Sequence, residues 1–190
     1  MNPELLLITH PAPTYAALAT APARVGAMRM FRRPALVALV LGCAVAMAGT
    51  RHVTPVLVVS ATACWSVLVV AQVVIALAVF ASPASRTVGV ARALDLFFAS
   101  HVPWSLWMLA VVVWAPVPGG RSLTPILVAA LVPMVLTARM IAAFCREVLR
   151  MERRQAMART ATHQVVTWGL LVAVFGWAVA LWPRIVQALT

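Results

Sequence analysis

Long apolar segments, separated by short polar connections, dominate the pattern along this chain. A bilayer core of about 30 Å is crossed by about 20 helical residues at roughly 1.5 Å each. Near that length, the sequence offers Pro34–Thr50, Val56–Phe80, Leu94–Trp114, Leu123–Phe144 and Val165–Trp182. Because backbone polar groups in lipid are paired internally, and no segment alternates like a barrel strand, these segments predict helices. We therefore expect an all-α, polytopic transmembrane helix bundle with five spans.

The N-terminal segment, residues 1–33, is predicted to be cytoplasmic or interfacial, ahead of a transmembrane domain at residues 34–190. Its first apolar stretch is too short to span a bilayer, and the prolines that begin at Pro11 interrupt a helix. Thr14 is placed to cap a short helix that runs to Ala19. Such a helix is expected to lie at the membrane interface.

The fourth apolar segment carries a helical pattern beyond its end. Met140, Phe144, Val148 and Met151 recur at the spacing of one helical face. This periodicity predicts that the fourth helix continues into the cytoplasm.

Composition and charge fit a membrane protein and fix its orientation. The chain is 64% hydrophobic and 10% charged, whereas soluble domains are about 45–50% apolar and about 25% charged. The net charge is +11, and all fifteen cations are arginine. With the N-terminus inside, twelve of the fifteen arginines lie on the cytoplasmic side. The sequence therefore predicts a multi-pass protein of the cell (inner or plasma) membrane, with a cytoplasmic N-terminus and the C-terminus outside.

The arginines also predict a partner. Because they lie between apolar segments, anionic lipid headgroups are the expected partner, and nucleic acid is not. The arginines assigned to headgroup contact are Arg29, Arg32, Arg33, Arg146, Arg150, Arg153 and Arg154.

Two alternatives concern the organisation of the spans. Arg32-Arg33, an apolar run and Ala46-Met47-Ala48 resemble a signal peptide with an A-x-A cleavage site, although the preceding region is long for one. Cleavage there would leave four spans. Residues 51–59 and 121–129 are similar in sequence, which fits either two like helix starts or a parallel two-helix repeat such as some transporters contain.

Few residues offer chemistry. The chain has four acidic residues and three cysteines without metal-ligand or disulfide spacing, and it lacks the common phosphate-binding, zinc-hydrolase and serine-hydrolase motifs. No catalytic residue, cofactor or metal site is predicted, and the chain is not expected to be an enzyme.

The candidate functional residues are polar or kinking positions within the spans. Asp95 lies near the cytoplasmic end of the third span and can pair with Arg92. Gln72, halfway along the second span, is expected to bond to another helix. Pro103 and Pro133 each remove a helical hydrogen bond and predict kinks.

His101 lies deeper in the third span than Asp95 and close to Pro103. Two interpretations stay open for it and for Asp95: structural bonding inside the bundle, or contact with an ion, a proton or a substrate in a cavity framed by the kinks.

Small residues form stripes that allow helices to approach closely. One stripe is Ala38, Gly42 and Ala46 in the first span. Another, in the fifth span, consists of Gly169, Ala173, Gly176 and Ala180. Such stripes favour a packed bundle or self-association, without separating the two.

Three stretches resemble the Yip (Ypt-interacting protein) domain family of five-span membrane proteins, in particular its bacterial members. They are P-A-P-T-Y-A-A-L with Arg-Arg-Pro-Ala at 32–35, A-R-A-L-D-L-F-F-A-S-H-V-P-W at 91–104, and R-M-I-A-A-F-C-R-E-V-L-R-M-E-R-R-Q-A at 139–156. The resemblance implies a cytoplasmic N-terminus and five spans. The long acidic and aromatic N-terminal region of the eukaryotic members linked to Rab-type GTPases is absent here.

Taken together, these features favour a scaffold or accessory subunit that associates with itself or with another membrane protein. The alternative is a small transporter or channel subunit that uses Asp95, His101 and Gln72 between the kinks at Pro103 and Pro133.

Overall fold

Helices make up the secondary structure of the described chain. The computed structural model describes residues 3–21, 27–81, 88–114 and 124–189, and no strand occurs within these ranges. The helices are α1 (Pro3–Thr9), α2 (Pro11–Thr20), α3 (Ala27–Thr50), α4 (Pro55–Phe80), α6 (Val90–Ala99), α7 (Val102–Trp114), α8 (Thr124–Ala129), α9 (Leu131–Glu147) and α10 (Arg153–Leu189). The all-α prediction is confirmed for these residues.

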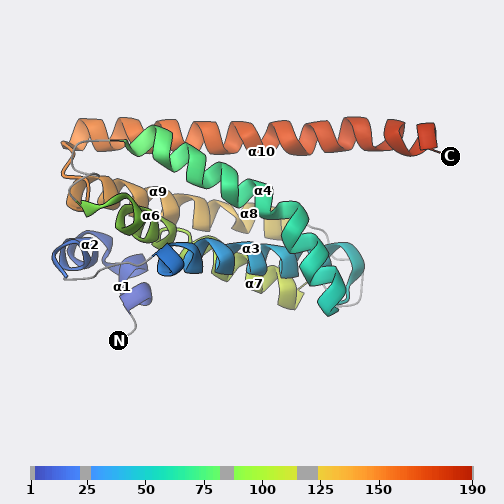
Figure 1. Cartoon of the computed structure of the whole chain (residues 1–190), viewed down its shortest axis with the longest axis horizontal. Coiled ribbons are helices and arrows are strands. Elements are labelled where there is room, and N and C mark those ends of the chain that lie inside the picture. Colours follow the sequence, from blue (N-terminus) through green and yellow to red (C-terminus); the bar gives the residue numbers. More distant parts are fainter. Residues whose placement is uncertain (1–2, 22–26, 82–87, 115–123, 190) are drawn as a thin grey trace.

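The long helical segments run along the long axis of the molecule in alternating directions (Figure 1). These segments are α3, α4, the pair α6–α7, the pair α8–α9 and α10. One end of the bundle holds α1 and α2, the starts of α3, α6 and α10, and the ends of α4 and α9. We call this end the basal end. The C-terminus of α10 lies at the opposite end.

Two described helices are long and apolar enough to cross a membrane, namely Met30–Thr50 within α3 and Pro55–Phe80. The pair Val90–Ala99 and Val102–Trp114, bent by 45°, adds a third if it forms one broken span. Aliphatic side chains cover the outside of the bundle, as on α4, where Val56 is 74% exposed. Apolar surface of this kind is covered by lipid in a membrane. The chain is therefore a helical membrane protein with two or three candidate spans among its described helices.

Close packing joins α3 to α4. Ala38, Gly42 and Ala46 are all buried, and a Cβ atom added to Gly42 would lie 2.8 Å from the backbone nitrogen of Thr62 and 2.9 Å from its Cα. Only a residue without a side chain permits that approach. The small-residue stripe of the first span is thus used inside the molecule, at the contact with α4.

Both predicted kinks coincide with breaks in the helices. The break between α6 and α7 falls at Ser100 and His101, just before Pro103. The break between α8 and α9 falls at Ala130, three residues before Pro133. In each case the proline lies in the first turn of the following helix, where its missing amide hydrogen has no helical acceptor.

The predicted extension of the fourth helix is much shorter than its periodicity indicates. α9 ends at Glu147, and the chain turns through Arg150, which adopts a left-handed conformation (φ 54°), before α10 begins at Arg153. Val148 and Met151, expected on a continuing helical face, are instead buried within this turn. The free energy gained by burying these two side chains in the core outweighs the free energy of continuing the helix.

Two short helices, α1 and α2, lie in the described part of the N-terminal segment, where the sequence predicts one, and α3 begins within the segment at Ala27. α1 is followed directly by α2, and Thr14 lies inside α2 with its hydroxyl donating to the carbonyl of His10 at 2.7 Å. Thr14 is therefore not the predicted cap. Pro11 begins α2 because the amides of a first helical turn need no helical acceptor.

Candidate functional site

An ion-pair cluster surrounds Asp95 at the basal end. Arg92 Nη1 lies 3.6 Å from Asp95 Oδ2, so the pair expected from the sequence is present. Arg33 Nε lies 3.3 Å from Asp95 Oδ1, and Arg33 Nη1 donates to the Asp95 carbonyl at 3.1 Å. The side chain of Asp95 is only 15% exposed. A carboxylate so enclosed needs cationic partners to remain charged. Its pairing with Arg33 also joins α6 to α3.

Three side chains, one of them Arg92 of this cluster, anchor the N-terminal helices. Arg92 Nη2 donates to the carbonyl of Leu18 at 3.0 Å, and Arg139 Nη2 donates to the carbonyl of Thr9 at 3.3 Å. The hydroxyl of the fully buried Tyr15 donates to the carbonyl of Leu96 at 3.1 Å. We call the contacts of Tyr15, Arg92 and Arg139 with these carbonyls the N-terminal clamp.

The hydroxyl of Tyr15 bonds to a carbonyl that the break between α6 and α7 leaves without its helical donor. The Ser100 amide donates to the carbonyl of Phe97 at 2.9 Å, so the Leu96 carbonyl lacks its usual helical donor. The Tyr15 hydroxyl takes that place. Burial raises the pKa of this hydroxyl above its usual range, with Arg33 opposing, and so keeps the donor protonated.

A second polar network joins α4 to α10. Gln72 Nε2 donates to Thr167 Oγ1 at 3.1 Å, and His163 Nε2 lies 3.1 Å from Gln72 Oε1. The histidine therefore carries its proton on Nε2, and its buried Nδ1 has no hydrogen-bond partner among the described residues. The expected bonding of Gln72 to another helix is therefore present, through both the nitrogen and the oxygen of its amide.

Aromatic rings link this network to His101. His163 stacks on Phe80 with ring centroids 5.5 Å apart, and Phe97 contacts the rings of both His163 (5.3 Å) and His101 (5.0 Å). His101 also stacks on Phe98 and is buried. Gln72, through His163, and His101 thus border the same cluster of aromatic rings. Asp95 is bound by arginines elsewhere on the third segment. Neither of the two best-defined pockets among the described residues is lined by Gln72, His101 or Asp95.

The predicted headgroup-facing arginines divide into two groups. The exposed members are Arg32, Arg146, Arg150, Arg153 and Arg154. Arg33 differs, because its guanidinium is turned toward Asp95 and is partly buried. The side chain of Arg29 lies outside the described residues.

Sequence reasoning missed Arg33, His163 and Thr167 as partners in these clusters. His163 and Thr167 are four residues apart, so they share one face of α10, and this spacing is a signal that the sequence carries. Arg33 offers no such signal, because 62 residues separate it from Asp95.

The described residues contain no group of three or more side chains suited to hold a metal ion. Comparison with family models, curated proteins and solved structures gives no match to this chain.

Proposed function

We propose that this protein is a five-span scaffold or accessory subunit of a membrane complex, without a catalytic site of its own. The polar residues that could have served chemistry hold helices together: Asp95 is paired with two arginines, and Gln72 is bonded to His163 and Thr167. The exposed arginines are proposed to contact anionic headgroups. The apolar outer faces are then left for lipid or for a second membrane protein.

The outward face of α10 is the observation that carries this proposal. Gly169, Ala173 and Gly176 are exposed, and a Cβ atom added to either glycine would meet nothing within 4 Å. Their spacing places them on one face, turned away from the side on which Thr167 bonds to Gln72. The corresponding stripe on α3 is covered by α4, whereas this one is open. A helix of a second copy or of another membrane protein can approach it closely.

Substituting the two open glycines tests this association. Gly169→Leu/Gly176→Leu should weaken association by about tenfold or more, because the new side chains hold the backbones apart. Energy transfer between donor- and acceptor-labelled copies in liposomes measures self-association, and co-purification from native membranes measures other partners.

Gly49→Leu is the matched control. Gly49 lies on α3 with equally open space around its Cβ position, so this variant should associate like the wild type. If the α10 variant kept both its energy transfer and every co-purifying partner, the scaffold proposal would fail.

The proposed orientation has a cytoplasmic N-terminus and the C-terminus outside, with α8–α9 and α10 as the fourth and fifth spans. The alternating direction of the long segments supports it (Figure 1), as does the arginine distribution. The resemblance to the Yip family enters this proposal through the architecture alone.

Reporter fusions to the full chain test the orientation. Alkaline phosphatase at the C-terminus should be active in a bacterial host, and a fluorescent protein at the same position should be dark. An epitope tag at the N-terminus should stay on the protein and resist protease added to spheroplasts. Loss of the tag would instead indicate cleavage after Ala48, and a bright C-terminal fusion would contradict five spans.

A further inference from the structure

A cavity of about 570 Å³ opens at the basal end of the bundle. The α1–α2 junction, residues 9–13, forms one wall, while α9 and the first turns of α10 form the others. Its volume lies within the range of about 300–1,000 Å³ that is usual for ligand sites. The polar clusters around Asp95 and Gln72 do not line it.

Three arginines give this cavity its charge. Arg139 and Arg146 are two helical turns apart on one side of α9, and Arg153 opens α10. No carboxylate lines the cavity. Arg139 commits one donor to Thr9, and Arg146 lies 3.8 Å from Glu147 with about half of its side chain exposed. Since a guanidinium has five N–H donors, most of them remain for an anion.

A buried polar atom lies deeper in the same cavity. Thr160 is 6% exposed, and its hydroxyl has no hydrogen-bond partner of good geometry among the described residues, although the Cys145 thiol lies nearby. Leaving such a group without a partner costs free energy. A ligand oxygen placed here would satisfy it, which points to a ligand with oxygens beyond its anionic group.

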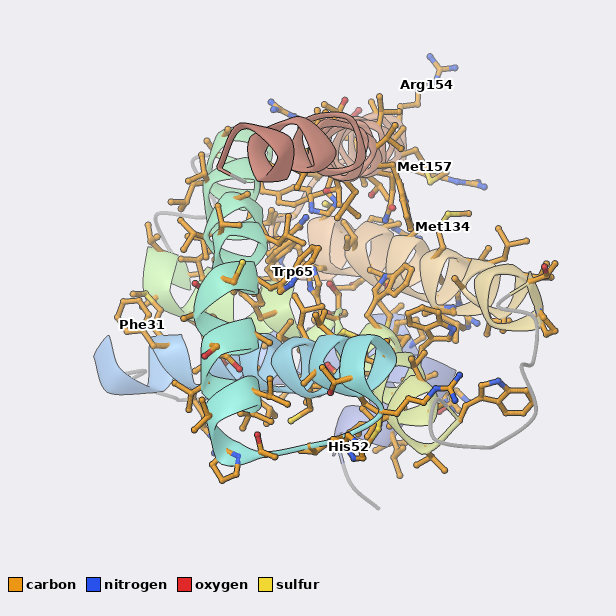
Figure 2. All side chains as sticks on the ribbon, turned by 90° about the vertical axis from the view of Figure 1, so that its right-hand side faces the viewer. Phe31, His52, Trp65, Met134, Arg154 and Met157 are labelled. Atoms are coloured by element: carbon orange, nitrogen blue, oxygen red, sulfur yellow. The ribbon has the colours of Figure 1, made fainter. Side chains whose placement is uncertain are left out.

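On α9 and α10 the remaining lining is apolar and leads toward the apolar face of the bundle, whereas Thr9 and His10 line the α1–α2 wall. Ala138 and Ala142 line the cavity on α9, and Met134 lies one turn before Ala138 on the same helical face. Met157 of α10, at the cavity, projects on the same side of the bundle as Met134 (Figure 2). An acyl chain could follow this apolar side away from the arginines.

We propose that this cavity binds the phosphate-bearing headgroup of one anionic phospholipid. Arg139, Arg146 and Arg153 hold the phosphate, the Thr160 hydroxyl meets a glycerol or ester oxygen, and the acyl chains leave past Met157 and Met134. A phospholipid has an anionic headgroup, a polar glycerol backbone and an apolar tail in this order, which matches the order of the cavity lining. A soluble phosphate ester lacks the apolar tail. The lipid would fasten the N-terminal helices to α9 and α10.

Titrating the full chain in an uncharged detergent with short-chain phosphatidylglycerol tests the site. The wild type should bind saturably, and Arg139→Gln/Arg153→Gln should lower the affinity by about tenfold or more, because two charge-assisted contacts are lost. The matched control is Arg32→Gln/Arg154→Gln, which removes the same charge from exposed positions outside the cavity. Arg154 projects away from the bundle (Figure 2). Arg32 and Arg154 are proposed to contact the headgroup layer in general and do not line the cavity, so the control should keep the saturable binding of the wild type.

A charge-neutral variant separates the cavity from general surface charge. Ala142→Phe fills the cavity and should also lower the affinity, with folding checked by helical content and by size-exclusion chromatography. Equal losses in the two arginine pairs, or unchanged binding by Ala142→Phe, would overturn the site. Inorganic phosphate and glycerol 3-phosphate should compete weakly. If either matched the lipid in affinity, the cavity would be a site for soluble phosphate and the lipid assignment would be wrong.

Discussion

Gly42→Ala should lower the free energy of unfolding by about 1–3 kcal/mol. The added methyl group would collide with backbone atoms of Thr62, at 2.8 and 2.9 Å, and backbone atoms cannot rotate aside as a flexible side chain can. α3 and α4 would have to separate, with loss of contact around Ala38 and Ala46. Unfolding of the detergent-solubilised protein with sodium dodecyl sulfate, followed by circular dichroism, measures the change.

Gly49→Ala, in the same helix, should have the opposite sign. Nothing lies within 4 Å of its Cβ position, and alanine is favoured over glycine in a helix by about 0.5–1 kcal/mol. Because Gly49 is near the end of α3, the gain in the free energy of unfolding should be at the lower end of this range. Equal effects of the two substitutions would show that the close contact with Thr62 does not determine the stability change at Gly42.

Asp95→Asn should destabilise the folded protein by about 2–4 kcal/mol. The substitution keeps the shape of the side chain but leaves Arg33 and Arg92, both largely enclosed, without their carboxylate. Since Arg92 also holds the carbonyl of Leu18, the N-terminal helices should loosen. Limited proteolysis within the first 21 residues should accelerate in parallel with the loss measured by detergent unfolding.

Glu147→Gln is the control for Asp95→Asn. Glu147 pairs with an arginine that is 52% exposed, and such pairs contribute only about 0–1 kcal/mol. In a double-mutant cycle, Arg33→Gln and Asp95→Asn should be strongly non-additive because each removes the same interaction. Additive effects, or an Asp95→Asn variant as stable as Glu147→Gln, would rule out the ion-pair cluster as a support for the N-terminal helices.

Hydropathy and proline placement predict the long helices well. The helical class, the apolar segments of α3 and α4, and the breaks near Pro103 and Pro133 follow from local physics that acts within one helical turn. Transfer of apolar side chains into lipid and the missing amide of proline need no knowledge of the rest of the fold. The count of five spans remains a prediction, because two or three are candidates among the described helices.

The turn between α9 and α10 lay beyond sequence reasoning. No glycine or proline marks it, and Arg150 adopts a left-handed conformation that non-glycine residues rarely take. Val148, Leu149 and Met151 are buried there, so tertiary packing overrides a periodicity that favours a helix. In the N-terminal segment the sequence predicts the short helix α2 but places its start at Thr14, because it treats Pro11 as a breaker, whereas Pro11 begins the helix. The preceding helix α1 is not predicted.

The sequence predicts the polar residues of the candidate site better than it predicts their bonding partners. Gln72 and Asp95 were identified because a polar group in an apolar segment needs a partner. Which partner it finds depends on contacts between residues far apart in the chain, such as Gln72 with Thr167, separated by 95 positions. Arg33 is the clearest case, since a cation beside a span fits headgroup contact and internal pairing equally well.

The N-terminal clamp also has a consequence for biosynthesis. Its partners are separated by up to 130 positions, as for Thr9 and Arg139, so α1 and α2 leave the ribosome long before α6 and α9 exist. At usual elongation rates this interval is on the order of ten seconds. During that time the two helices lack the partners on α6 and α9 that hold them in the folded protein. Closure of the clamp therefore follows the synthesis of α9.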